Sequence, residues 1–208
     1  ENLNADVQNN ISQEILNISL DKPYAMVTFH PVTLEDCDSE KQMKELFIAC
    51  QQHREMNFIF TKSNADASGR IINQMIDKFV DENDNAIAFA SLGMKKYLSA
   101  LKFSSMVIGN SSSGLIEAPS FCIPTINIGD RQKGRLQAAS VINCLPKSEA
   151  IEKAIGLALS DDFRDKARIT VNPYGNGKTS EKIVSNIKYL LLDGKVNLKK
   201  KFYDCGVN

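Results

Sequence analysis

A strand, a serine-rich turn and a helix follow one another in Met106-Val107-Ile108-Gly109-Asn110-Ser111-Ser112-Ser113-Gly114-Leu115-Ile116-Glu117-Ala118-Pro119-Ser120. The N–H groups of such a turn lie at a helix N-terminus, where unsatisfied donors and a partial positive charge hold phosphates in α/β proteins. Gly109 and Gly114 allow a sharp turn and the close approach of a ligand. Three serines before a helix are also typical of an ordinary N-cap, so the surrounding pattern has to decide between these interpretations.

Strand and helix patterns alternate on both sides of this stretch. Apolar runs predict strands at 24–29, 57–61, 86–90, 105–108, 125–128 and 140–144. Apolar residues at helical spacing predict helices at 39–54, 68–80, 94–101, 115–121, 148–159, 161–168 and 178–192. This alternation with short connections predicts an α/β fold with a doubly wound, Rossmann-like parallel sheet.

The pattern also predicts the domain organisation of the 208 residues. Residues 1–21 are polar and rich in asparagine, which indicates a linker with a short helix. Residues 22–193 are predicted to form one Rossmann-like domain that ends in a long helix, and residues 194–208 to form a C-terminal tail. The first residue is not methionine, so we expect a fragment of a longer protein.

The charge balance, the cysteines and the length of the apolar runs limit the kinds of partner, cofactor and location that are expected. The 25 lysines and arginines balance the 25 aspartates and glutamates, which argues against a nucleic-acid or acidic membrane partner. The five cysteines are scattered without a Cys-x-x-Cys pair, so neither a disulfide framework nor a metal site is expected. No apolar run approaches the roughly 18 residues that span a membrane. We therefore expect a cytoplasmic protein without a metal or cofactor.

Several polar groups follow the predicted strands directly. They are His30, Ser91, the serine turn and the glycine-bracketed basic loop at 129–135. In doubly wound sheets, ligands bind in the crevice beyond the carboxyl ends of the strands. The arrangement therefore predicts a site for a phosphorylated ligand, although His30 could also cap its strand and the arginines of the loop could be solvated charges.

The sequence resembles the C-terminal half of UDP-N-acetylglucosamine 2-epimerases, which have two Rossmann-like domains in the GT-B arrangement. The resemblance rests on Thr-Phe-His-Pro-Val-Thr at 28–33, on the turn and helix at 109–120, and on the segment at 124–135. These motifs look like the hydrolysing branch, which makes N-acetylmannosamine and UDP for sialic acid synthesis. The non-hydrolysing branch typically has His-Arg-Arg-Glu after the first strand and Asp-Ser-Gly-Gly at the turn, and this sequence has neither.

The resemblance implies roles for residues that match its motifs. Ser111 and Ser112 match the serines that hold the diphosphate, and Arg131 matches an arginine of the nucleotide site. His30 matches the active-site histidine, whose imidazolium would stabilise negative charge on the departing UDP. It is the one catalytic residue expected in this chain.

Two further residues match the nucleoside part of the site. Glu117 corresponds to the glutamate that accepts hydrogen bonds from the ribose hydroxyls, although an acidic residue near a helix start is favourable without a ligand. Tyr97 corresponds to the aromatic residue that stacks on uracil. By its spacing with Met94 and Leu101 alone, Tyr97 would be interpreted as a core residue.

The expected partners are UDP, UDP-N-acetylglucosamine and an N-terminal domain of the same protein, and a homo-oligomer is left open. In the family that domain carries the acidic residues that move the proton at C2, so the isolated chain is expected to be inactive. A non-hydrolysing epimerase and a GT-B glycosyltransferase are the alternative enzymes. A nucleotide-binding module without catalytic activity is the alternative from another class.

Overall fold

A computed structural model describes residues 22–32, 39–63 and 67–192. The chain divides into two compact units between Pro173 and Tyr174. The predicted linker at 1–21 and the predicted tail at 194–208 lie outside the described residues, and the predicted domain boundaries stay a prediction.

The first unit is built on a six-stranded sheet in the order β3-β2-β1-β4-β5-β6. The strands are β1 (Tyr24–Thr28), β2 (Asn57–Thr61), β3 (Ala86–Phe89), β4 (Met106–Gly109), β5 (Thr125–Ile128) and β6 (Val141–Cys144). All five strand pairs are parallel. The strand order reverses between β1 and β4, which confirms the doubly wound fold and places a ligand crevice at the ends of these two strands.

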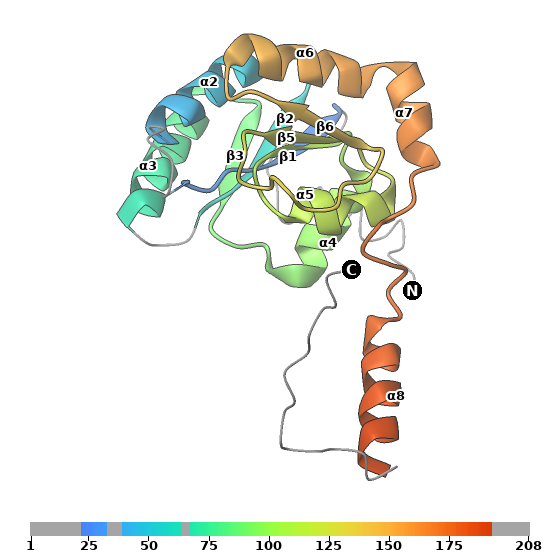
Figure 1. Cartoon of the computed structure of the whole chain (residues 1–208). Helices are drawn as coiled ribbons and strands as arrows, with labels where there is room; N and C mark the ends of the chain where they lie inside the picture. Colours follow the sequence, from blue (N-terminus) through green and yellow to red (C-terminus); the bar gives the residue numbers. More distant parts are fainter. Residues whose placement is uncertain (1–21, 33–38, 64–66, 193–208) are drawn as a thin grey trace, which may run out of the picture. The chain divides into compact units, whose positions relative to one another are not determined.

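Helices cover both faces of the sheet (Figure 1). They are α2 (Ser39–Gln51), α3 (Ala67–Glu82), α4 (Gly93–Phe103), α5 (Ser113–Ile116), the 3₁₀ turn η1 (Ala118–Phe121), α6 (Ser148–Leu159) and α7 (Asp161–Arg168). Ala25 and Val27 of β1 belong to a core with α2, α3 and α6, while Tyr24 and Met26 belong to a core with α4 and η1. Since strand side chains alternate between faces and both faces are covered, β1 is buried along its whole length and is apolar from Tyr24 to Val27.

The second unit contains α8 (Thr179–Leu192). None of the residues of this helix is buried. Its apolar residues at 183, 184 and 187 are each about half exposed. The long helix predicted at 178–192 is therefore confirmed as an element.

The structure differs from the predicted elements mainly after β4. The predicted helix at 115–121 is instead the one-turn helix α5 followed by η1. Pro119 has no backbone N–H, so the α-helical hydrogen bond to Leu115 cannot form and the chain continues as a 3₁₀ turn. The helix is therefore shorter, and its dipole weaker, than the sequence pattern predicts.

Two glycines are required for the packing of this turn. Gly109 has a φ of +138°, and a Cβ there would collide with the carbonyl oxygen of Thr28 on the neighbouring strand. A Cβ at Gly114 would lie 2.6 Å from Cγ2 of Thr125 on β5. The turn can therefore approach both neighbouring strands only because these positions lack side chains.

A third glycine gives a testable stability prediction. Gly156 lies exposed within α6, its φ is outside the left-handed region, and a Cβ there would meet nothing within 4 Å. We expect Gly156→Ala to raise the free energy of unfolding by about 0.5–1 kcal/mol, because alanine restricts the unfolded chain without strain in the helix. Urea denaturation would measure this.

The matched control is Gly134→Ala, which also places a methyl group in open space but at a φ of +80°. It should lower stability, because an L side chain is strained there. Equal stability of Gly156→Ala and the unmodified chain would contradict the prediction.

Candidate functional site

A cleft of about 360 Å³ opens at the carboxyl ends of β1, β2 and β3. Its lining includes His30 after β1, Tyr97 of α4, and Ser111 and Ser113 of the serine turn. His30, Tyr97 and Ser111, whose roles the resemblance implies, therefore line one cleft together with Ser91, which follows β3. Ser112, Glu117 and Arg131 do not line it, and the structure places them as described below.

Asn110 joins the serine turn to the end of β1. Its buried side chain accepts a hydrogen bond from the backbone N–H of His30 at 2.7 Å and donates one to the carbonyl oxygen of His30 at 2.8 Å. Its own backbone oxygen accepts hydrogen bonds from Arg131 and Gln132 of the loop after β5, at 3.0 and 2.7 Å. The sequence analysis missed this role, because nothing in a local pattern shows which distant backbone an amide will reach.

The serine turn presents unused donors. Among the described residues, the backbone N–H groups of Ser111 and Ser112 have no hydrogen-bond partner. Ser112 is the N-cap residue of α5, but its hydroxyl makes no capping bond. Consecutive free N–H groups form a concave anion site without help from a long helix. Because α5 is only one turn long, these local donors matter more than the helix dipole.

Tyr97 is held in place at the wall of the cleft. Its hydroxyl and the Ser113 hydroxyl lie 2.5 Å apart. Burial raises the pKa of Tyr97, the hydrogen bond to Ser113 opposes this, and the negative charge of Glu117 raises it further. The tyrosine is partly buried against the core beneath α4, so the interpretation of Tyr97 as a core residue is confirmed, and its stacking role stays a prediction. A neutral ring fixed in this way can serve as a rigid stacking surface.

Glu117 follows α5 directly. Its Oε2 atom is buried and, within the described part of the chain, has no hydrogen-bond partner. A buried oxygen of this kind is costly unless a donor reaches it. This observation favours a ligand with hydroxyl groups beside α5, which is the role that the family resemblance implies for Glu117.

Arg131 lies exposed on the loop after β5, and its Nη1 donates to the carbonyl oxygen of Asn110 at 3.0 Å. Desolvation and then the positive charge of Arg135 lower the pKa of Arg131. An anion bound beside these two guanidinium groups would relieve their repulsion. The contact with Asn110 brings Arg131 to the serine turn, as the predicted nucleotide role requires.

The orientation of His30 depends on a serine that the sequence analysis did not single out. The hydroxyl of Ser63 donates to the carbonyl oxygen of Phe29 at 2.6 Å, and its oxygen lies 3.4 Å from Nδ1 of His30. Since the hydroxyl proton is used, the Ser63 oxygen can only accept from the imidazole. This favours the tautomer with a proton on Nδ1.

The described residues also bear on metal binding and membrane crossing. In the ranges that the structure describes, no group of three or more His, Cys, Asp and Glu side chains is arranged to hold a metal ion. No helix in the described part is both long and apolar enough to cross a membrane.

Comparison with known proteins identifies the family. The model of UDP-N-acetylglucosamine 2-epimerases matches residues 1–188. The chain belongs to this family. The resemblance inferred from the three motifs is therefore confirmed, and the match includes the strands, the serine turn and the loop after β5.

Two curated relatives of this epimerase family member are named for different sugars, diacetylbacillosamine and polysialic acid. GDP/UDP-N,N'-diacetylbacillosamine 2-epimerase (hydrolyzing) of Campylobacter jejuni is 42% identical over 132 residues, which are 63% of this chain and 34% of the relative. Polysialic acid biosynthesis protein P7 of Escherichia coli is 38% identical over 187 residues, which are 89% of this chain and 47% of the relative. The chain thus spans less than half the length of these relatives.

Solved structures show the same fold. UDP-GlcNAc 2-epimerase of Methanocaldococcus jannaschii, in complex with UDP-GlcNAc and UDP, superposes with a TM-score of 0.68 at 20% identity and covers 90% of this chain and 49% of that protein. The S. aureus MnaA–UDP structure gives 0.67 at 23% identity, with coverage of 89% and 50%. At these identities the likeness supports the fold.

Proposed function

We propose that this chain is the UDP-binding, C-terminal half of a GT-B type, cytoplasmic enzyme that hydrolyses UDP-N-acetylglucosamine to N-acetylmannosamine and UDP. The observation that carries the proposal is the pair of free N–H groups at Ser111 and Ser112, next to a cleft lined by His30 and Tyr97. The family match and the relatives named as hydrolysing epimerases support the reaction type.

Each part of UDP has a proposed partner. The diphosphate binds the serine turn at Ser111 and Ser112, with Arg131 as the cation, because free N–H groups and a guanidinium both favour phosphate oxygens. Ribose hydroxyls donate to the unpartnered oxygen of Glu117. Uracil stacks on Tyr97. These assignments account for the unused polar groups described above.

The proposed reaction has two steps. First, a base removes the C2 proton while the C1–oxygen bond breaks, so that UDP leaves and a 2-acetamidoglucal remains. Protonated His30 stabilises the negative charge that develops on the departing diphosphate. Water then adds across the double bond, with its hydroxyl at C1 and a proton at C2 on the face opposite to the one first deprotonated.

The groups that move the C2 proton are proposed to lie on a domain outside this chain. We therefore expect the 208-residue chain to bind UDP, to bind UDP-N-acetylglucosamine little better, and to release no N-acetylmannosamine. Positioned acids and bases contribute roughly a hundred- to ten-thousand-fold each, so a half-site should bind without turnover. Titration calorimetry and product chromatography would test both parts, and measurable turnover by this purified chain would contradict the placement of the base.

A second candidate substrate is UDP-N,N'-diacetylbacillosamine, because a relative 42% identical over 132 residues is named for that reaction. Product analysis of the full-length protein with both sugars would separate the two. Free N-acetylmannosamine with UDP supports the proposal, whereas UDP-N-acetylmannosamine indicates a non-hydrolysing epimerase. Transfer only in the presence of an acceptor sugar indicates a glycosyltransferase, and binding without turnover indicates a non-catalytic module.

A further inference from the structure

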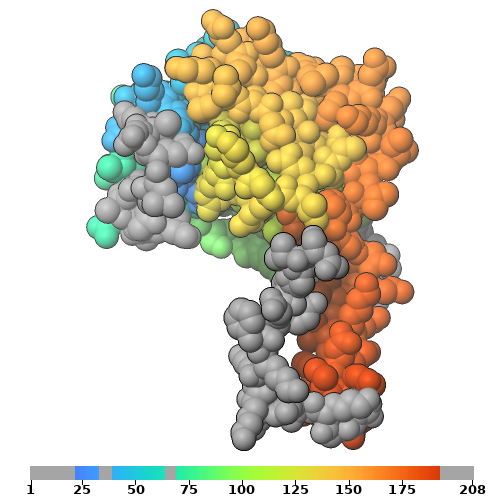
Figure 2. Space-filling view, in the orientation of Figure 1, coloured from blue at the N-terminus to red at the C-terminus, as the bar shows by residue number. Residues whose placement is uncertain are grey.

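A second cleft, also of about 360 Å³, lies beyond the carboxyl ends of β5 and β6. Part of the segment that forms it, shown in yellow, lies on the face of the molecule seen in Figure 2. Its lining includes Asn127, Gln137 and Asn143, together with residues of the loop after β5. None of its lining residues belongs to the nucleotide site proposed above.

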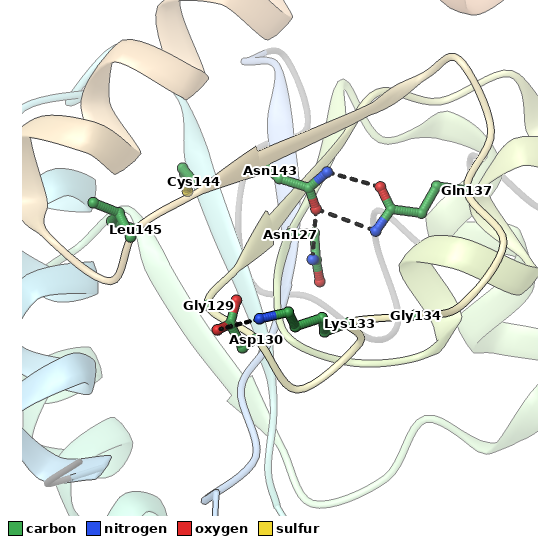
Figure 3. A pocket seen from close by; sticks show the side chains of 9 residues that line it. All are labelled: Asn127, Gly129, Asp130, Lys133, Gly134, Gln137, Asn143, Cys144 and Leu145. Atoms are coloured by element: carbon green, nitrogen blue, oxygen red, sulfur yellow. Dashed lines mark hydrogen bonds and ion pairs between the residues drawn. The ribbon is translucent and has the colours of Figure 1, made fainter. Parts of the chain in front are cut away.

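Three amide side chains form a connected network in this cleft (Figure 3). Asn127 donates from Nδ2 to Oδ1 of Asn143 at 2.8 Å. Asn143 donates from Nδ2 to Oε1 of Gln137 at 2.7 Å, and Gln137 returns a bond from Nε2 to Oδ1 of Asn143 at 3.2 Å. Each amide nitrogen carries two protons, so every member of the network keeps a second donor.

The network also contains an unpaired acceptor. Asn127 is only 3% exposed, and its Oδ1 has no hydrogen-bond partner among the described residues. In Figure 3 this oxygen points away from Asn143 and toward the side of the cleft formed by Lys133. Reversing Asn127 alone would oppose two oxygens, whereas reversing all three amides together would keep every bond and place Nδ2 of Asn127 at this point. A ligand that fills the cleft must therefore pair with an amide group here, which a group able both to donate and to accept can do in either orientation.

One acidic and one basic side chain line the cleft, so its ionic side chains carry no net charge. Nζ of Lys133 lies 3.7 Å from Oδ2 of Asp130, so the two charges largely neutralise each other. A hydroxyl group fits best, since it can both donate to and accept from the amide groups of the network.

The remaining walls suit a small ring. A Cβ built at Gly129 or at Gly134 meets nothing within 4 Å, so the loop leaves open space. Cys144 and the 70% exposed Leu145 supply an apolar surface. Such a surface can contact the C–H face of a sugar while the amides bind its edge.

We propose that this second cleft binds a neutral saccharide, a hexose or N-acetylated hexose ring that carries no nucleotide. It is separate from the UDP site, because Arg131 of the same loop contacts the serine turn while Lys133 and Gly134 face the second cleft. The proposal rests on the amide network and does not depend on the proposed reaction.

The test is an NMR titration of the 208-residue chain with free N-acetylglucosamine, with and without saturating UDP. We expect saturable shifts confined to residues 127–145, with an affinity that UDP does not change. Gln137→Ala, at an exposed position, should weaken binding about three- to tenfold, the usual effect of losing one hydrogen bond. Gln51→Ala, at an exposed glutamine of α2, is the matched control and should leave the affinity unchanged.

Asn127→Leu is a second variant, which removes the unpaired oxygen at nearly the same volume. It should lose the sugar response and keep its affinity for UDP, a result that a merely unfolded variant would not give. Shifts that rise without saturation, or that UDP displaces, would overturn the proposal, and so would an unchanged affinity of Gln137→Ala. Inorganic phosphate should produce no shifts in these residues, and binding of phosphate there would equally contradict it.

Discussion

Replacing Ser112 with aspartate should abolish UDP binding and leave the fold intact. The new carboxylate would lie in the turn that is proposed to hold the diphosphate, where like charges at contact distance repel strongly. The Ser112 hydroxyl makes no capping bond, so its replacement removes no hydrogen bond that holds the turn. We expect an affinity loss of at least about 100-fold, on the order of 3 kcal/mol.

Titration calorimetry with UDP measures this loss, and circular dichroism checks the fold. Ser112→Ala keeps every backbone donor of the turn, so its affinity should fall by no more than about tenfold. Ser185→Asp adds the same charge at an exposed position of α8 and should bind UDP normally. Unchanged UDP affinity in a folded Ser112→Asp variant would remove the serine turn from the nucleotide site.

Gly109→Ala should destabilise the first unit severely. The added Cβ would collide with the backbone oxygen of Thr28, which cannot move without breaking the β1–β4 pairing. The φ of +138° adds strain for any L side chain. We expect the free energy of unfolding to fall by about 3 kcal/mol or more, which places this change among the largest single-residue effects.

Urea denaturation compares this variant with Gly129→Ala. Gly129 has a φ of +70°, but a Cβ there would meet nothing within 4 Å, so only the conformational cost of about 1–2 kcal/mol applies. A similar loss in the two variants would mean that contact with β1 contributes nothing at Gly109. In that case the close approach of the serine turn to β1 would not be a structural requirement.

The sequence alone determined the alternation of elements and the edge of the sheet where ligands bind. Continuous apolar runs predicted the bounds of β2 and β5, and helical spacing predicted those of α6 and α7. These signals are local, since they depend on neighbouring residues and on turn chemistry. His30 and Ser111 could be chosen for one site because each follows a predicted strand, whereas Tyr97 was added only by the family resemblance. The structure does bring all three to one cleft.

Tertiary structure decided how that edge is held together. Asn110 bonds to His30 across 80 positions of sequence, Ser63 reaches His30 across 33, and Asn127 meets Asn143 only because β5 and β6 are paired. The unpaired oxygens of Glu117 and Asn127 likewise exist only after folding has removed water from them. Strand order and register set these contacts. No local sequence pattern predicts them, because the residues next to an amide or carboxylate do not determine which distant group it will bond to in the folded protein, or whether it will have a partner at all.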